Sequence, residues 1–182
     1  MKTIICENFG PLDNLVYKEV DIPEIKNPDD ILIKVFSSGV NFPDGLLVQG
    51  KYQLKPPVPF TPGMEVSGEV FNIGSEVTEF KIGDRVAGLS QLGGYSEYSL
   101  LNKTSVYKIP IEMEHDQACA LLCAYGTSHY ALKQRANLKK GDTLVVLGAS
   151  GSTGVAAIQI GKIMGAKVIA AASSIEKQNY TK

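Results

Sequence analysis

The chain of 182 residues lacks several features that would assign its class at once. It has three cysteines, an odd number, which fits reduced thiols better than a framework of disulfides. No segment approaches about eighteen uninterrupted apolar residues, and the opening MKTIIC contains no long apolar core before a cleavage site. We therefore expect a cytoplasmic protein without a membrane-spanning segment.

An excess of charge of one sign is also missing, because 18 Lys and Arg stand against 19 Asp and Glu, for a formal net charge of −1. This balance gives no reason to expect a nucleic-acid or membrane partner. The sequence contains no internal repeat and no low-complexity tract. Its length and its apolar content of 44% are typical of a globular chain with one large or two small domains.

The most informative pattern lies in the last quarter of the chain. Residues 143–147 (TLVVL) are apolar and β-branched, which predicts a strand, and they lead into a loop at 148–154 (GASGSTG). Residues 155–164 predict a largely buried helix, and residues 167–172 predict a second strand. The order is typical of the first half of a dinucleotide-binding Rossmann fold, although a purely structural strand–helix–strand connection would have the same order.

The glycines of the loop have separate predicted roles. Gly151 would let the backbone approach a pyrophosphate, and Gly154 would let the helix pack closely on the strand, while Ala149 takes the place of the usual first glycine. Free amides at a helix start favour negative charge. We therefore predict a cofactor-binding segment made of Ser150, Gly151, Ser152, Thr153, Gly154 and Val155.

The residues after the second predicted strand indicate which cofactor binds. NAD sites usually place an Asp or Glu there for the ribose hydroxyls, but this chain has alanines followed by Ser173 and Ser174. These hydroxyls and Lys177, one turn further on, could accept a ribose phosphate, so we predict NADP(H). Alternatively, one serine caps the next helix and Lys177 is only a solvated side chain, and capping and phosphate binding can coexist.

The sequence before residue 143 has a different texture. Short alternating strands, such as 31–36 and 64–70, are separated by Gly, Pro and Asp, which predicts an all-β, barrel-like domain over residues 1–112. A helical pattern follows and predicts a linking helix within residues 113–140. Residues 141–182 then form the predicted partial Rossmann domain.

Several motifs in this order resemble the medium-chain dehydrogenase/reductase superfamily, and above all its zinc-free NADPH:quinone oxidoreductase branch, the zeta-crystallin-like enzymes. The resemblance covers the whole chain and implies a GroES-like catalytic domain, then a Rossmann domain, with the active site in the cleft between them. The motifs are SGVNFPD (38–44), GKY (50–52), PGMEVSG (62–68), GDRV (83–86) and AYGT (124–127).

Two positions suggest that no metal takes part. Where zinc-dependent relatives carry a Cys and a His, this chain has Asn41 and Met64, and an amide and a thioether are poor zinc ligands. The cysteine-rich structural zinc lobe has no counterpart either. A minority alternative is a metal held by His115, Cys119 and Cys123, which recur at four-residue spacing, but three residues over two helical turns span more than one ion can gather.

The resemblance implies an NADPH-dependent reductase of small quinones or α,β-unsaturated carbonyls. Asn41 would hydrogen-bond near the nicotinamide and the substrate oxygen, Asp44 would orient Asn41 or its loop, Tyr52 would line the substrate cleft and Thr127 would bond the carboxamide. Structural alternatives remain for three of them: Asn41 as a turn residue before Pro43, Tyr52 as a strand-edge aromatic, and Thr127 as a helix-end hydroxyl.

The length departs from the family, because a complete Rossmann domain needs two halves and this chain supplies barely one. We therefore expect the chain to be truncated within the Rossmann domain, with its own turnover in doubt, and the full-length form to be a homodimer as in relatives. Two alternatives stay open: an enoyl-thioester reductase of the same superfamily, and a non-catalytic nucleotide-binding or structural protein.

Overall fold

The computed structural model describes residues 1–181, which separate into two compact units, Met1–Ala120 and Leu121–Lys182. The division falls inside the segment predicted as the linking helix, and the predicted domain limits at 112 and 140 stay predictions. Within residues 1–181, no helix combines the length and the apolar character needed to cross a bilayer. Each unit is described by itself below.

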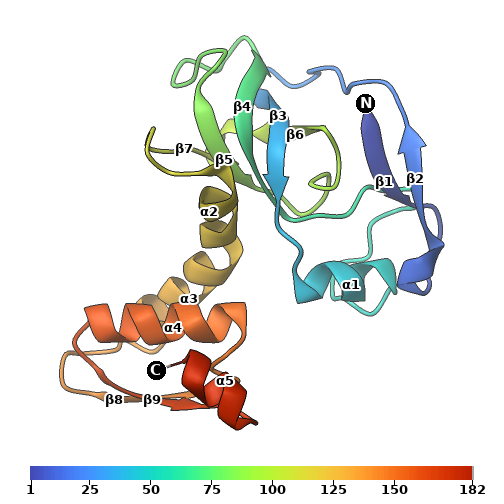
Figure 1. Ribbon diagram of the computed structural model, residues 1–182. Helices are drawn as coiled ribbons and strands as arrows, with labels where there is room; N and C mark the ends of the chain where they lie inside the picture. The colour runs from blue at the N-terminus through green and yellow to red at the C-terminus, as the bar shows by residue number, and fades with distance from the viewer. Residues whose placement is uncertain (182) are drawn as a thin grey trace. The chain divides into compact units, whose positions relative to one another are not determined.

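Antiparallel strands form the framework of the first unit. One sheet has five strands in the order β6-β3-β4-β5-β7, and β1 pairs with β2 separately. Figure 1 shows β3, β4 and β5 side by side. The strands are β1 (Lys2–Cys6), β2 (Leu15–Glu19), β3 (Asp30–Ser38), β4 (Glu65–Ile73), β5 (Arg85–Leu89), β6 (Tyr98–Asn102) and β7 (Val106–Lys108).

The pairing of β3 with β4 bends the sheet. Their register shifts twice along the pair, and such irregularities bend a strand and increase its twist. The strands also approach closely at Gly68, where a Cβ atom would lie 1.9 Å from the Lys34 carbonyl oxygen. The strands predicted at 31–36 and 64–70 are therefore both present, as parts of a curled antiparallel sheet.

The main core lies on the concave side of this sheet. Alternate apolar residues of its strands are removed from water, and each fully buried Val, Leu or Ile contributes about 1.5–3 kcal/mol. The buried residues of this core are Ile31, Ile33, Val66, Val70, Val77, Val86, Leu101 and Val106.

A second core cluster holds helix α1 (Phe42–Val48) in place. Leu47 and Val48, at the end of the helix, are buried together with Cys6 and Phe60. The Cys6 and Phe60 backbones exchange hydrogen bonds of 2.8 and 3.1 Å, which ties β1 to the segment before β4. Since only the end of α1 is buried, its first turn stays near the surface.

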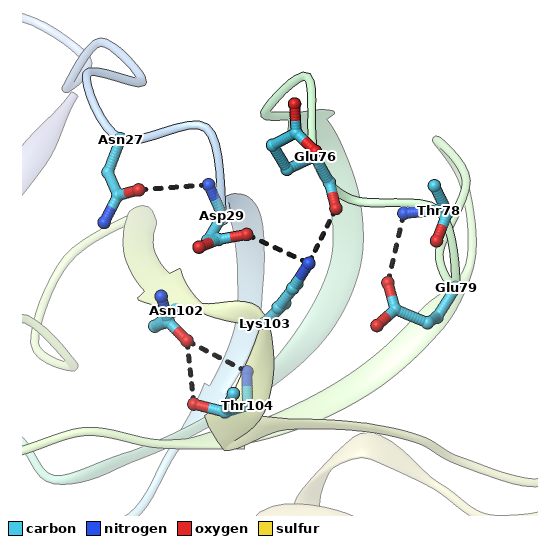
Figure 2. A network of polar contacts seen from close by, with 8 residues as sticks. All are labelled: Asn27, Asp29, Glu76, Thr78, Glu79, Asn102, Lys103 and Thr104. Atoms are coloured by element: carbon cyan, nitrogen blue, oxygen red, sulfur yellow. Dashed lines mark hydrogen bonds and ion pairs between the residues drawn. The ribbon is translucent and has the colours of Figure 1, made fainter.

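A polar network joins three loops of the first unit at the 310-helix η2 (Lys103–Ser105) (Figure 2). The Lys103 ammonium donates to the Glu76 carbonyl oxygen at 2.7 Å and lies 2.9 Å from an Asp29 carboxylate oxygen. Asn27 and Asn102 accept hydrogen bonds from the backbone within their own loops. Residues about 25 to 75 positions apart are thus held together by exposed contacts, which are individually weak.

The helical segment predicted after the β unit is present from residue 115 to residue 135. In the first unit it comprises α2 (His115–Ala120), which packs on β3 and β4. In the second unit it continues as η3 (Leu121–Tyr125), α3 (Gly126–His129) and η4 (Tyr130–Arg135), where η3 and η4 have the wider π-helical hydrogen bonding. A short 310-helix, η1 (Leu12–Asn14), precedes β2.

The second unit contains a parallel pair of strands covered by a helix (Figure 1). Strands β8 (Thr143–Leu147) and β9 (Lys167–Ala171) pair in register, and α4 (Ser152–Ile163) packs on both. Helix α5 (Ile175–Tyr180) follows β9. The predicted strands are confirmed, but the helix starts at Ser152, three residues earlier than expected, because Gly151 already takes the extended N-cap conformation.

Candidate functional site

Asn41 stands at the start of α1 and is held by its main chain. Its backbone N–H donates to the Asp44 carboxylate oxygen Oδ2 at 2.8 Å, and the Asp44 N–H donates to the Asn41 carbonyl oxygen at 3.0 Å. Asn41 and Asp44 therefore form a reciprocal cap on the helix. The structural alternative for Asn41, a residue that ends a turn before Pro43, describes its backbone correctly and leaves its side chain available for a site.

The Asn41 side chain is oriented by Glu65. Its amide Nδ2 donates to the Glu65 carboxylate oxygen Oε1 at 2.7 Å, from strand β4. Glu65 is only 4% exposed and lies against Gly39, where a Cβ atom would be 2.1 Å from Oε1. Because a carboxylate only accepts, the amide NH2 group must face Glu65, which sets the orientation of the amide.

Asp44 itself is held by Tyr95. The Tyr95 hydroxyl donates to Asp44 Oδ2 at 2.9 Å, and the Asp44 side chain is 3% exposed. Burial raises the pKa of the Tyr95 phenol, and the hydrogen bond to Asp44 and the charges of Asp44 and Glu65 raise it further. Tyr95 therefore stays protonated at neutral pH and serves as a donor. The predicted role of Asp44, which is to orient Asn41, agrees with this geometry and stays a prediction.

A pocket of about 430 Å³ opens beside these residues in the first unit. Its walls are mainly apolar, with a few polar groups, the usual composition of a small-molecule site. Val40 and Phe42, on either side of Asn41, are 85% and 81% exposed. We call it the Asn41 pocket; it is lined by Leu12, Leu15, Val40, Asn41, Phe42, Asp44, Gly45, Leu46, Val48, Gln49 and Tyr95.

Tyr52 is not among the residues that line the Asn41 pocket. It is half-buried and packs against the second core cluster, with Leu47 and Phe60 among the neighbours. The structure thus groups Asn41 with Asp44 but places Tyr52 in apolar packing. Its predicted role in the substrate cleft stays a prediction.

The residues considered as metal ligands have other contacts. The ring nitrogen Nδ1 of His115 lies 2.8 Å from the buried Ser67 hydroxyl, and Met64 packs against the second core cluster. Cys119 is buried, and burial followed by the charge of Glu65 raises the pKa of its thiol to about 12. Among residues 1–181, no group of three or more His, Cys, Asp or Glu is placed to hold a metal ion.

In the second unit, the glycine loop brings α4 close to the end of β8. Gly148 has a φ of +65°, and a Cβ atom at Gly154 would lie 2.5 Å from the Gly148 carbonyl oxygen. At Gly151 the nearest atom to such a Cβ would be 3.5 Å away, an ordinary contact. Gly154 is therefore required by the packing of the protein, as predicted, whereas Gly151 leaves open space at the helix start.

The other predicted loop residues surround this helix start. Ser150 and Val155 are half-buried, while Ser152 and Thr153 are exposed in the first turn of α4. Ala149 is fully buried, and its N–H donates to the Ala171 carbonyl oxygen at 3.1 Å, which joins the loop to the end of β9. The four residues thus lie where a bound phosphate would meet the free amides of α4, and their role stays a prediction.

Thr127 is exposed, and its neighbour Ser128 makes the connection to the loop. The buried Ser128 hydroxyl donates to the Thr153 carbonyl oxygen at 2.9 Å, and the Tyr125 hydroxyl donates to Gln159 at 2.7 Å. These bonds hold the π-helical segment against α4. Thr127 is consequently placed on a supported helix with its side chain available, and its contact with a cofactor stays a prediction.

The predicted ribose-phosphate site lies after β9. Ser174 is the N-cap of α5, and its hydroxyl accepts from the Lys177 backbone N–H at 3.3 Å. Ser173 and the Lys177 side chain are exposed. The capping alternative is therefore confirmed for Ser174, and it leaves Ser173 and the Lys177 ammonium available to a phosphate.

Three residues of these networks were missed or set aside in the sequence. Glu65 had been left out because its ligand-related role lapses without zinc, and Tyr95 had been assigned only to a turn. Ser128 had no signal beside Thr127. Only burial could have identified them, since an acidic residue inside a run of small and apolar strand residues needs a buried partner.

Comparison with known proteins agrees with these features. Residues 27–111 match the family of the alcohol dehydrogenase GroES-like domain. A quinone oxidoreductase-like protein 2 homolog from Nematostella vectensis is 41% identical over 172 residues, covering 93% of this chain and 47% of the relative. The quinone oxidoreductase of Sus scrofa is 40% identical over 171 residues, with 93% and 52% covered.

The solved quinone oxidoreductase of Thermus thermophilus, described with its NADPH complex, superposes with a TM-score of 0.84 at 33% identity, over 97% of this chain and 55% of that one. The chain thus spans about half the length of the curated relatives it matches. The predicted fold class, a GroES-like β unit followed by the first half of a Rossmann fold, is confirmed. The chain belongs to the medium-chain dehydrogenase/reductase superfamily, in its quinone oxidoreductase branch.

Proposed function

We propose that this chain carries the acceptor pocket and the diphosphate-binding part of an NADPH-dependent reductase of quinones or α,β-unsaturated carbonyls that works without zinc. The observation that carries the proposal is the pairing of two features in one chain. One is the Asn41 pocket with an amide in place of a zinc ligand, and the other is a glycine loop whose Gly154 has no room for a Cβ atom.

The second unit supports a cofactor with a ribose phosphate. Gly151 leaves open space at the start of α4, where the free amides and the helix dipole favour a diphosphate. No carboxylate stands between the end of β9 and Ser174 to repel an additional phosphate. The Lys177 ammonium is the cation placed to meet it, and the NADPH complex of the Thermus thermophilus relative points to the same coenzyme.

The first unit supports chemistry without a metal. The Asn41 amide nitrogen is engaged with Glu65, and an amide nitrogen is not a zinc donor. Without a Lewis acid to polarise an alcohol, the suitable acceptors are already electron-poor, as quinones and conjugated carbonyls are. The apolar walls of the Asn41 pocket fit such a flat, largely apolar molecule.

When bound, NADPH would supply the hydride, so the task of this chain is positioning. Glu65 and Asp44 hold Asn41 by its side chain and its backbone, so that its amide keeps one orientation toward a ligand. Tyr95 keeps Asp44 in place as a protonated donor. Phe42 and Val40 supply apolar surface that excludes water from a bound acceptor. The homodimer and the cytoplasmic location implied by the resemblance stay predictions.

Binding of the two coenzymes tests the cofactor assignment directly. Calorimetric titration of the 182-residue chain with NADPH and with NADH should give a preference of about tenfold or more for NADPH, because a phosphate pairs with an ammonium in a charge-assisted bond. Adenosine 2′,5′-bisphosphate should bind more tightly than adenosine 5′-monophosphate for the same reason. Lys177→Gln should remove most of both preferences, and Lys167→Gln, at the opposite end of β9, should leave them unchanged.

Turnover and metal content test the remainder. Oxidation of NADPH by 1,4-naphthoquinone, followed by the absorbance of the reduced nicotinamide, is the expected activity. Equal binding of NADH and NADPH would contradict the cofactor assignment, and one zinc per chain in elemental analysis would contradict the metal-free mechanism. Coenzyme binding without any oxidation would instead favour the non-catalytic alternative.

A further inference from the structure

The Asn41 pocket has an unusual charge environment for a site of its size. Two carboxyl side chains, Asp44 and Glu65, are buried beside it at 3% and 4% exposure. Asp44 lines the pocket directly, and Glu65 lies behind Asn41. Buried charges act through a medium of lower dielectric constant than water, so their fields reach a ligand with little screening.

Neutral groups hold the carboxylate that lines the pocket. The partners of Asp44 Oδ2 are the Tyr95 hydroxyl and the Asn41 backbone N–H, at 2.9 and 2.8 Å. Its other oxygen, Oδ1, is buried and makes no hydrogen bond within residues 1–181. The contacts of Asp44 therefore orient it without cancelling its charge.

Two neighbouring side chains report the sign of the local potential. The charges of Asp44 and Glu65 both contribute to the raised pKa of the Tyr95 phenol, and the charge of Glu65 contributes to the raised pKa of the Cys119 thiol. In each case burial is the largest cause, and the carboxylates add to it. Conditions that disfavour a phenolate and a thiolate also disfavour an anionic ligand in the same place.

Cations do little to offset this potential at the pocket. None of the residues that line the Asn41 pocket is Lys or Arg. The nearest basic side chain in the sequence, Lys51, donates to Gln49 at the edge of the pocket and is exposed, so water and salt screen its charge.

We propose that Asp44 and Glu65 are specificity-determining residues that make the Asn41 pocket select uncharged acceptors and reject anionic ones. This inference rests on the proposed function and narrows its substrate class. A carboxylate on the acceptor ring would face Asp44 in an apolar surrounding. At an effective dielectric constant of about 20, a like charge roughly 8 to 12 Å away weakens binding about ten- to thirtyfold.

The test compares two ligands of nearly equal shape that differ in charge. Calorimetry would measure the dissociation constants of 1,4-naphthoquinone-2-carboxamide and 1,4-naphthoquinone-2-carboxylate for the 182-residue chain without coenzyme, because the whole pocket lies in the first unit. We expect the carboxamide to bind at least about tenfold more tightly. The ratio should fall toward one in Asp44→Asn and in Glu65→Gln, which keeps an acceptor for Asn41.

Glu69→Gln is the matched control, since Glu69 lies four residues further along β4 and does not line the pocket, and its ratio should equal that of the parent. Far-ultraviolet circular dichroism would check that each variant folds, and the parent chain alone needs no variant to test the first expectation. Equal binding of the two quinones, a ratio unchanged in a folded variant, or no binding of either quinone would overturn the inference. Failure of the proposed function would show separately, as absent coenzyme binding with the quinone ratio intact.

Discussion

The two units differ sharply in charge, although the chain as a whole is nearly neutral. Residues 1–120 carry 10 Lys and Arg against 17 Asp and Glu, whereas residues 121–182 carry 8 against 2. The proposed acceptor pocket lies in the acidic unit, and the proposed diphosphate site lies in the basic one. Such a distribution favours a polyanionic coenzyme at one unit and disfavours anions at the other. The total charge of −1 therefore hides the feature that matters for ligands.

The units also differ in how fully their sheets are covered. In the first unit, residues such as Ile31 and Ile33 are completely buried in a curled antiparallel sheet. In the second, Leu147 is 79% exposed, and Val145 and Ile169 are also exposed. Parallel sheets are normally covered on both faces, and here α4 covers one. Packing defects should therefore cost the second unit a larger share of its stability.

Gly154→Ala should give the largest effect and break this comparison on one side only. The added Cβ would lie 2.5 Å from the Gly148 carbonyl oxygen and 2.8 Å from the Ala149 backbone, which cannot rotate away as a side chain can. We expect the second unit to lose about 2–3 kcal/mol, as overpacking does elsewhere. Hydrogen exchange measured by mass spectrometry should show faster exchange in residues 121–182 and no change in residues 1–120.

Gly126→Ala provides the control in the same unit. No atom lies within 4 Å of a Cβ at Gly126, which is helical, so the change should be neutral or slightly stabilising. Protection that drops equally in both units of Gly154→Ala, or equally in both variants, would contradict the predicted role of the close contact.

Ser128→Ala and Thr127→Ala should sharpen the comparison at neighbouring positions. Loss of the buried Ser128 bond to the Thr153 carbonyl oxygen should cost about 1–2 kcal/mol, since that oxygen then lacks a partner. Thr127 is exposed, so its replacement should leave the unfolding midpoint in urea unchanged and weaken only NADPH binding. An equal loss of stability in both variants would contradict this separation.

Much of this architecture follows from local sequence patterns. The alternation at 31–36 and the β-branched run at 143–147 predict strands that are present, because their periods match the faces they bury. The glycine loop likewise predicts the close approach at Gly154. Patterns of this kind depend on neighbours in the sequence, which is why they could be interpreted without a structure.

The interactions that orient the candidate site could not be predicted in the same way. Glu65 meets Asn41 across 24 positions, and Tyr95 meets Asp44 across 51. Their partners depend on how β4 and the turn before β6 fold over α1, which no local period encodes. The start of α4 was misplaced for a simpler reason: Ser152 and Thr153 suit a loop by composition but also suit the first turn of a helix.

Asp84→Asn should give the smallest effect and tests whether individual charge pairs matter in the acidic unit. Asp84 lies 2.8 Å from the Lys108 ammonium, and this hydrogen bond, aided by the Lys81 backbone, holds the pKa of the Asp84 carboxyl below its ordinary value of 3.8. The native state therefore binds this proton less readily than the unfolded chain, so the pair stabilises the fold above about pH 4 and loses that contribution as the pH falls further. Because Lys108 is exposed, we expect the parent to exceed the variant by at most about 0.5 kcal/mol at neutral pH. Urea unfolding near pH 7 and near pH 2.5 would measure the difference, which should vanish in acid. A gap that persists or widens at the lower pH would show that Asp84 acts through packing instead of charge.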